Sequence, residues 1–261
     1  MTTNYLQIKD NISTNINPNR LERLESIFES LTESYDFIGG IYIVGLSNNI
    51  CLSNSSLRTN PSGRTDKKRH NFLFSNVKMK KLRNEFANKA IKYEPNMKGV
   101  QNNDYLIFRY EGRDEGTLQC RKVLDKYGVR SRFFYRYHDE ENPEFTVCFL
   151  LMSNKHPDML TSFCNSVRAE LLEELECFHN LVFSSRKVAE LNPLTGMGLI
   201  NNKGHEVIKL IAEGHSRASI AKILFITERG VDYHITKLKI FFDAKNNAEL
   251  IAKSFKYRII S

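Results

Sequence analysis

Hydrophobic residues recur at intervals of three and four in several segments of the chain, which is the spacing of a helix with one apolar face. This spacing predicts helices over residues 21–31, 77–93 and 118–127. Segments rich in β-branched and aromatic residues lie between them and predict strands over residues 37–46, 105–110, 131–137 and 145–152. We expect residues 47–49 to form a hairpin turn into residues 50–52, residues 53–71 to form a loop, and residues 138–143 to join the last two strands as an antiparallel hairpin.

The longest periodic stretch follows Pro157. Its apolar residues, at intervals of three and four, are Leu160, Phe163, Val167, Leu171, Leu175, Phe178 and Val182. No glycine or proline interrupts residues 158–191, so the pattern predicts one long helix. The apolar stripe either packs on the sheet of its own domain or forms a dimer seam of near-heptad spacing, and both can hold along different parts of its length.

The chain divides after this stretch. Residues 192–198 contain Pro193, Gly196 and Gly198, which is the composition of a linker. We therefore expect a domain over residues 1–191, a linker over 192–199 and a second domain over 200–261. The order of helices and strands predicts an α+β fold, in which the first domain is an α/β/α sandwich with a central antiparallel sheet and the second is all-α with four helices.

The second domain begins with a predicted helix over residues 202–213 that ends at Gly214, a residue suited to a left-handed helix cap. Ser216 and Thr227 are predicted N-caps of the next two helices, the second of which spans residues 228–241. A fourth helix is expected over residues 246–257. Two short helices joined by a tight turn, the second amphipathic with cations on its outer face, are typical of a helix-turn-helix.

These residues also resemble a known family at fixed offsets over about 50 positions. The matching residues are Glu206, Val207, Leu210, Ala212, Glu213, Gly214, Ser216, Ile220, Ala221, Leu224, Ile226, Thr227, Glu228, Val231, His234 and Ile235. The segment resembles the DNA-binding domain of LuxR-type transcriptional regulators. It departs from that pattern at residues 200–204, where the family has Leu-Thr-x-Arg-Glu. Because Gly204 cannot return a capping-box hydrogen bond, we expect a looser helix start by about 1 kcal/mol. It departs again at Asn247, which stands at the position of an arginine.

The resemblance implies which residues meet DNA. Base contacts are expected from Asp232, Tyr233 and Thr236. The alternative for Asp232 is a favourable interaction of its carboxylate with the positive end of the helix dipole. Phosphate contacts are expected from Ser216, Arg217, Arg229, Lys237 and Lys239. Thr227, Glu228 and His234 complete the expected DNA-binding set, with His234 either packing or contacting phosphate. The fourth helix is the usual dimer contact of the family, and we expect Lys253, Lys256 and Arg258 to form its solvated face.

The first domain is similar in layout to the sensor domain of LuxR-type quorum-sensing regulators, and also to PAS-like and GAF-like sensors. The acyl-homoserine lactone pocket of that family uses tryptophans and an Asp-Pro pair, and the chain has neither. A different ligand, or none, is therefore expected. Tyr42, Phe133 and Tyr135 are candidate ligand-binding residues, and core packing is the alternative for each. A phosphoacceptor receiver domain is disfavoured because residues 47–49 carry no acidic pair.

The net charge differs between the two predicted domains. The chain carries 38 Lys and Arg against 30 Asp and Glu, a net charge of +8. Residues 192–261 hold 11 cations and 6 anions, whereas residues 1–191 hold 27 and 24, so the excess is concentrated where DNA binding is expected. The basic stretch 58–83 is either a solvated surface or an accessory phosphate contact.

No nucleophile, phosphate-loop or metal-ligand motif occurs, and we expect neither an enzyme nor a cofactor or metal. The five cysteines form no CxxC pair, the chain starts without a leader pattern and no apolar run is long enough to span a membrane, all of which predict a cytoplasmic protein. We expect a homodimeric, sequence-specific transcription regulator that binds double-stranded DNA, with a first domain that controls dimerisation or senses a small molecule. The alternative is a protein-interaction regulator that sequesters a related DNA-binding partner in mixed dimers.

Overall fold

The structure, a computed structural model, describes residues 20–46, 70–143, 145–184, 194 and 200–260. The elements of the N-terminal domain are α2 (Arg20–Ser34), β1 (Gly39–Leu46), β2 (His70–Phe74), α4 (Val77–Lys89), the 3₁₀ turn η1 (Ile91–Tyr93), α5 (Met97–Asn102), β3 (Tyr105–Phe108), α6 (Glu115–Lys126), β4 (Ser131–Tyr137), β5 (Phe145–Ser153), α7 (Pro157–Ser166) and α8 (Arg168–Ser184). The C-terminal domain consists of α10 (Asn202–Ala212), α11 (Arg217–Leu224), α12 (Glu228–Phe242) and α13 (Asn247–Lys256).

The five strands form one antiparallel sheet in the order β2-β1-β5-β4-β3. The predicted hairpin over the last two strands is confirmed, since β4 pairs with β5 from Ser131 opposite Ser153 to Tyr137 opposite Val147. The first strand, β1, lies next to the edge strand β2 and pairs on its other side with β5, the central strand of the sheet.

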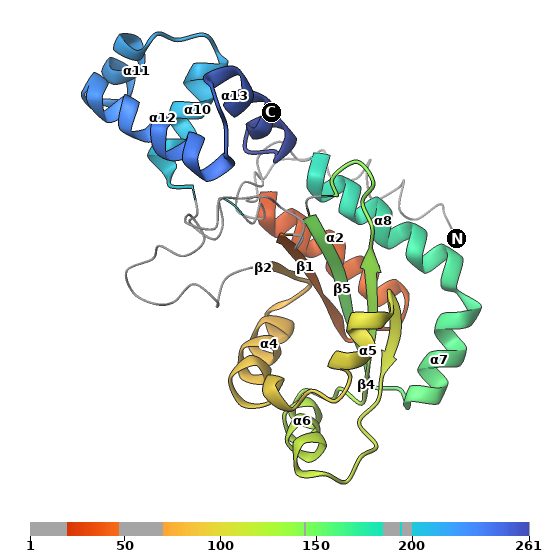
Figure 1. Ribbon diagram of the computed structural model, residues 1–261. Helices are drawn as coiled ribbons and strands as arrows, with labels where there is room; N and C mark the ends of the chain where they lie inside the picture. The colour runs from red at the N-terminus through yellow and green to blue at the C-terminus, as the bar shows by residue number, and fades with distance from the viewer. Residues whose placement is uncertain (1–19, 47–69, 144, 185–193, 195–199, 261) are drawn as a thin grey trace.

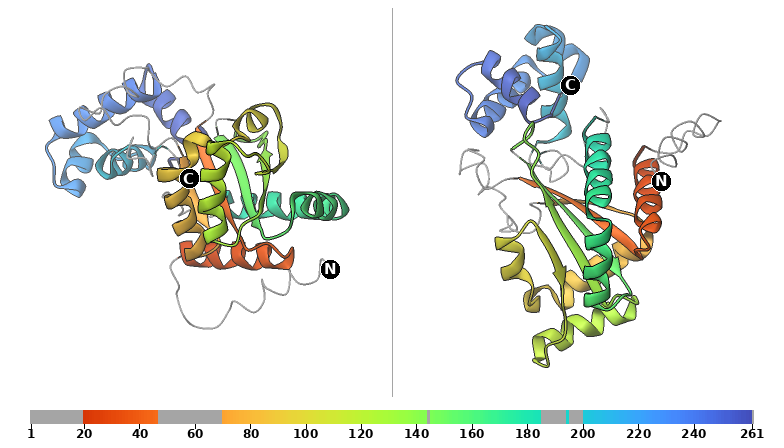
Figure 2. Two further views of the ribbon diagram at one scale, coloured as in Figure 1. Left: turned by 90° about the horizontal axis from the view of Figure 1, so that it is seen from below. Right: turned by 90° about the vertical axis from the view of Figure 1, so that its right-hand side faces the viewer.

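Alternating residues of the strands face two helical layers, because successive side chains of a strand point to opposite faces. On one face, Tyr42 and Val44 pack in a core with helices α2, α7 and α8. On the other, Ile41 packs with α4 and α6. Figures 1 and 2 show the sheet between these two layers. The predicted α+β fold, with an α/β/α domain around a central antiparallel sheet and an all-α domain after it, is confirmed.

A glycine allows α2 to lie close to the sheet. A Cβ atom on Gly40 would come within 2.6 Å of Phe28 Cζ and 2.8 Å of Leu151 Cδ2. Any side chain at this position of β1 would therefore push α2 away from the strands. The ring of Phe28 in turn stacks on Phe178 of α8 at a centroid distance of 4.8 Å, so both helices of this layer meet over the strand.

The prediction of one uninterrupted helix over 158–191 is wrong, since α7 ends at Ser166 and α8 begins at Arg168. The hydroxyl of Ser166 donates to the carbonyl of Phe163 at 2.7 Å, which gives the backbone a local alternative to the regular helix. Val167 then adopts φ −116° and ψ 15°, outside the helical range. Residues 185–191 of the predicted helix lie outside the described residues.

The apolar stripe of this stretch packs on its own sheet. Leu171, Leu175 and Phe178 are fully buried in the core that contains Tyr42. Of the two interpretations of the stripe, packing within the domain is confirmed for these residues, and the face expected to form a dimer seam is occupied inside the chain.

Three smaller predictions need correction. Residues 70–71, expected at the end of a loop, begin the strand β2 at residues 70–74, and residues 97–102 form the helix α5, which was not predicted. The predicted helix over 77–93 is interrupted, because Ala90 leaves the helical conformation and a 3₁₀ turn follows. The turn over residues 47–49, the strand over 50–52 and residues 53–69 of the expected loop lie outside the described residues.

A buried ion pair lies between the sheet and the α4/α6 layer. Arg132 of β4 donates to Glu94, and both side chains are almost completely inaccessible to solvent. The guanidinium carbon lies 4.6 Å from the ring centroid of Phe86, 4.8 Å from that of Phe108 and 5.1 Å from that of Tyr110. Around Arg132 this helix-to-sheet interface is thus filled by aromatic side chains.

Candidate nucleic-acid interface

The C-terminal domain is built around a core of its own. Helix α12 contributes Val231, Ile235 and Leu238, which lie at helical spacing and are buried against α10 and α11. Leu194 and Ile200 belong to the same core, and the Ile200 amide donates to the Leu194 carbonyl at 3.0 Å. Leu194 therefore packs with the helical domain although it falls within the expected linker.

Local sequence fixes the start of each helix, and the N-caps predicted at Ser216 and Thr227 are confirmed. Asn201, Ser216, Thr227 and Asn246 each cap a helix by accepting a hydrogen bond from the backbone three residues on, at 2.7, 3.2, 3.0 and 2.8 Å respectively. Gly214 has φ 85°, which confirms the predicted left-handed end of α10.

The turn between α11 and α12 is tight. Phe225 adopts a left-handed conformation with φ 53°, and the Ile226 amide closes the turn by donating to the Ala221 carbonyl at 3.0 Å. The ammonium group of Lys203 on α10 donates to the Leu224 carbonyl at 2.8 Å and so holds the C-terminal end of α11. The lysine contact was not predicted, because nothing in the sequence links position 203 to a carbonyl that lies on another helix.

The outer face of this pair of helices is exposed and carries the predicted residues. The exposed members of the set are Ser216, Arg217, Thr227, Glu228, Arg229, Asp232, Tyr233, Thr236 and Lys237, whereas His234 and Lys239 are half-buried. All of them lie on α11, on α12 or at the caps of these two helices. The structure thus brings the predicted set together on one helix pair.

One charge pair on this face links the two helices. Arg217 Nε lies 2.6 Å from Asp232 Oδ1, so the aspartate holds the guanidinium of α11 beside α12. The sequence predicted either a base contact or an interaction with the helix dipole for Asp232. The ion pair with Arg217 is a third role. Arg217 is the first residue of α11, so the pair joins the N-terminal end of that helix to α12.

His234 is less exposed to solvent than the neighbouring Tyr233. Its partial burial, together with the charges of Lys237 and Lys203, lowers the pKa of the imidazole below its ordinary value. The ring is consequently neutral near pH 7, and it meets the ring of Tyr233 edge-on at a centroid distance of 5.4 Å. Tyr233 itself is 61% exposed.

The expected solvated face of α13 needs correction at Lys253, which is half-buried, whereas Arg258 is exposed and also makes a specific contact. Lys253 donates to the carbonyls of Phe242 and Asp243 at 3.0 and 2.7 Å and so caps the end of α12. Arg258 bonds to Asn142 of the N-terminal domain at 2.6 Å. Both side chains therefore make specific contacts, since unpaired carbonyls at a helix end and a nearby amide oxygen are strong acceptors for a cation.

The three candidate ligand-binding residues of the N-terminal domain lie in or beside its core. Tyr42 and Phe133 are fully buried among other aromatic rings, and the hydroxyl of the half-buried Tyr135 donates to Glu176 at 2.8 Å. A pocket of about 280 Å³ lies elsewhere and does not include them. Its lining residues are Tyr110, Glu111, Arg121, Leu124, Asp125, Val129, Arg130, His156 and Pro157.

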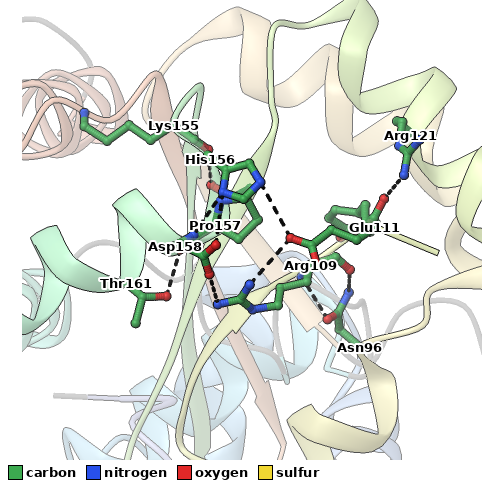
Figure 3. Close-up of polar contacts among 11 residues, drawn as sticks. Asn96, Arg109, Glu111, Arg121, Lys155, His156, Pro157, Asp158 and Thr161 are labelled. Carbon is green, nitrogen blue, oxygen red and sulfur yellow. Dashed lines mark hydrogen bonds and ion pairs between the residues drawn. The ribbon is translucent and has the colours of Figure 1, made fainter.

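Charged side chains beside this pocket neutralise one another (Figure 3). Arg109 lies 2.7 Å from Asp158 and 3.5 Å from Glu111, and His156 faces both of these acids at 3.4 and 3.7 Å. Arg121 donates to the backbone carbonyl of Tyr110. Four ionisable side chains beside the pocket thus contact one another, and Arg121 is held by a backbone carbonyl.

Two short helices, a tight turn and an exposed polar face on the second helix define a helix-turn-helix domain. Residues 202–254 match the family model of bacterial regulatory proteins of the luxR family, and this segment carries the helix-turn-helix domain of that family. No curated protein sequence matches the chain. Among the described residues, no helix is long and apolar enough to cross a membrane, and no cluster of His, Cys, Asp and Glu could hold a metal ion.

Solved structures of similar proteins include SdiA of Escherichia coli, at 14% identity and a TM-score of 0.40, with 98% of this chain and 97% of that chain covered. SdiA in complex with octanoyl-rac-glycerol gives 12% identity and a TM-score of 0.38, with 99% and 98% covered. CepR2 of Burkholderia cenocepacia, described as an N-acylhomoserine lactone dependent LuxR family transcription factor, gives 13% identity and a TM-score of 0.39, with 60% and 88% covered. TM-scores below 0.5 are too low to support a functional inference for this chain.

Proposed function

We propose that the protein is a sequence-specific DNA-binding regulator of transcription that acts as a homodimer. The observation that carries this proposal is the exposed face of α12 within a domain that matches the luxR family. The major groove of DNA admits one helix, and side chains on its N-terminal turns reach the base edges. Asp232, Tyr233 and Thr236 occupy such positions on α12 and are exposed.

Cations around these residues suit the phosphate backbone. Arg229, Lys237 and Arg217 are exposed on α11 and α12, and the N-terminal end of α11 carries the positive end of the helix dipole. Phosphate contacts of this kind position a protein on DNA without reading its sequence, so the two groups of residues have separable effects.

Dimerisation is supported by an exposed apolar strip on α13. Ala248, Ala252 and Phe255 lie at helical spacing of four and three and are exposed, with Phe255 49% accessible. A two-fold pairing of this strip would bury it and would place two recognition helices on one face of the duplex. Helix-turn-helix dimers read half-sites that are about one helical turn apart in this way.

For the N-terminal domain we propose control of dimerisation in preference to lactone sensing. Tyr42 and Phe133 are fully buried in the core, the Arg132–Glu94 pair is buried in the other helix-to-sheet interface, and Arg109, Glu111, His156 and Asp158 beside the pocket contact one another. These observations support a domain that holds its shape without a ligand of the lactone class.

Affinity measurements with variants on α12 test the proposal. A DNA site is first selected from a random library with the purified protein, and the dissociation constant is then measured on that site and on scrambled DNA. We expect Thr236→Ala to weaken binding to the selected site by about 1–3 kcal/mol with little effect on scrambled DNA. Lys237→Ala should weaken both and reduce the salt dependence. Sequence-blind binding that survives the loss of Arg229 and Lys237 would refute the proposal.

A further inference from the structure

A chain of hydrogen bonds runs from the core of the N-terminal domain toward its surface. The hydroxyl of Tyr42 on β1 lies 2.9 Å from Nδ1 of His179 on α8, and Nε2 of the same ring lies 3.0 Å from Asp139. Tyr42 and His179 are fully buried. Because a carboxylate only accepts hydrogen bonds, Nε2 of His179 carries the proton and Nδ1 accepts from the tyrosine.

The charge states of His179 and Asp139 agree with a proton on Nε2 of His179. Burial lowers the pKa of His179 despite the neighbouring carboxylate, so the imidazole is neutral near pH 7. Burial opposes the ionised form of Asp139, but hydrogen bonds from His179 and Asn142 outweigh this effect and lower its pKa. The Tyr42 hydroxyl, both ring nitrogens of His179 and the Asp139 carboxylate thus each have a hydrogen-bond partner of the matching kind.

Asn142 extends the chain to the surface. Its backbone amide and its side-chain amide donate to Asp139 at 3.1 and 2.6 Å, which fixes the orientation of the side chain. Its Oδ1 atom accepts from Arg258 Nε at 2.6 Å. Arg258 also donates to the carbonyl of Phe183 at 3.1 Å, and its guanidinium carbon lies 5.4 Å from the centroid of that ring.

The backbone around Arg258 belongs to the C-terminal domain. Ile259 and Ile260 are buried in the core of the helical domain, and the Ile259 carbonyl lies 2.8 Å from Nε2 of His205 on α10. Figure 1 shows α13 and the C-terminus on the side of the helical domain that faces the sheet domain. One residue is therefore held by the helical domain through its backbone and by the sheet domain through its side chain.

We propose that Arg258 is a clamp that couples the DNA-binding domain to the Tyr42–His179–Asp139–Asn142 chain and so fixes the position of the recognition helix for binding to two half-sites. The clamp leaves the exposed face of α12 and the apolar strip of α13 accessible, since Tyr233 is 61% and Phe255 49% exposed. The clamp therefore positions the helical domain and leaves its proposed DNA-binding face free to contact DNA. The part of this proposal that concerns binding to two half-sites rests on the proposed DNA-binding activity.

A fixed position matters for the second half-site. When one recognition helix of a dimer is bound, the other binds at an effective concentration set by how tightly its position is restricted. Loss of the clamp should lower this effective concentration without altering the contacts that either helix makes. The expected signature is weaker binding to DNA with two half-sites and unchanged binding to DNA with one.

The first experiment tests the clamp without DNA, using the full chain and the variants Arg258→Gln and Asn142→Ala. Each removes one partner, and Lys209→Gln, an exposed lysine of α10, is the control for the loss of one charge. We expect the NMR signal of the His179 Nε2 proton to shift, and amide exchange at residues 258–260 to quicken, in both clamp variants and not in the control. Signals and exchange rates equal to those of the wild-type protein would overturn the proposal.

The second experiment compares affinities for one and two half-sites taken from selected DNA. We expect both clamp variants to weaken binding to two half-sites on the order of tenfold, the double variant to be no weaker than either single one, and binding to one half-site to stay unchanged. Equal losses on both DNAs, or none, would refute the positioning role. A wild-type protein that does not discriminate DNA sequences would refute the proposed function instead, and the NMR measurement would still decide whether the clamp exists.

Discussion

Removal of the Glu94 carboxylate should destabilise the N-terminal domain strongly. Its Oε2 atom accepts from Arg132 and, at 2.9 Å, from the hydroxyl of Tyr110. Its Oε1 atom accepts from the backbone and side-chain amides of Asn96 at 3.1 and 2.7 Å. In Glu94→Ala these donors lose their partner, and the guanidinium of Arg132 is left charged and buried.

The size of the effect follows from that burial. The side chains of Arg132 and Glu94 are 5% and 1% exposed, so solvent cannot replace the lost carboxylate. Removing one partner of a buried ion pair costs about 3–5 kcal/mol. For a chain of this size, that loss corresponds to a fall in the melting temperature of about 6–20 °C. The three aromatic rings around the guanidinium offset a part of the cost.

Thermal and urea unfolding followed by far-UV circular dichroism measure this effect. Glu173→Ala, which removes an exposed carboxylate of α8, is the control and should leave the melting temperature almost unchanged. The double variant Glu94→Leu with Arg132→Met should recover most of the loss, because it leaves no buried charge. A melting temperature of Glu94→Ala within about 2 °C of wild type would show that the pair is not buried as described.

Three further predictions concern the cap, the buried histidine and the interhelical ion pair. Asn201→Ala removes the acceptor of the Gly204 amide and should destabilise the helical domain by about 1 kcal/mol in urea unfolding, and an unchanged midpoint would contradict the capping role. The lowered pKa of His179 means that the unfolded chain takes up a proton near pH 6.5 while the folded chain does not, so the free energy of unfolding should fall as the pH drops below about 6.5. His179→Gln should flatten this dependence, and equal slopes in both proteins would count against a neutral buried ring. Asp232→Ala frees Arg217 and should tighten binding to scrambled DNA while reducing sequence discrimination in fluorescence anisotropy, and a variant that discriminates as well as wild type would show that Asp232 has no part in recognition.

The features that were predicted from the sequence are local ones. Caps at Ser216 and Thr227 depend on one side chain and an amide three residues on, and the hairpin of β4 and β5 depends on two adjacent runs of strand-forming residues. The C-terminal helices were predicted for the same reason, because each combines a capping residue and a periodic apolar face within a short stretch.

Two contacts that escaped prediction join residues far apart in the chain. Arg132 and Glu94 are 38 positions apart, and Arg258 and Asn142 are 116 positions apart, so no local pattern indicates either contact. The strand β2 was missed because it has only five residues and adjoins a polar segment. The break at Val167 was missed because it involves neither glycine nor proline, and a serine hydroxyl accompanies it.

The role of the aromatic residues on the strands also required the structure. Tyr42 and Phe133 alternate with other residues in a way that suits a cavity wall as well as a core. Only the layers on both sides of the sheet decide between these roles, since α2 and α8 place Phe28 and Phe178 around the Tyr42 ring. Aromatic residues on a strand thus predict that the strand is buried, but they do not predict whether it lines a cavity or packs in a core.

Genome-wide mapping of bound DNA tests the central claim most directly. The protein is expressed in bacterial cells, crosslinked to DNA and recovered, and the bound fragments are sequenced in parallel with those of a Tyr233→Ala, Thr236→Ala variant. The proposed function predicts discrete sites that share a motif with two-fold symmetry and that the variant loses. Uniform recovery of DNA, or the same sites with the variant, would contradict recognition through α12.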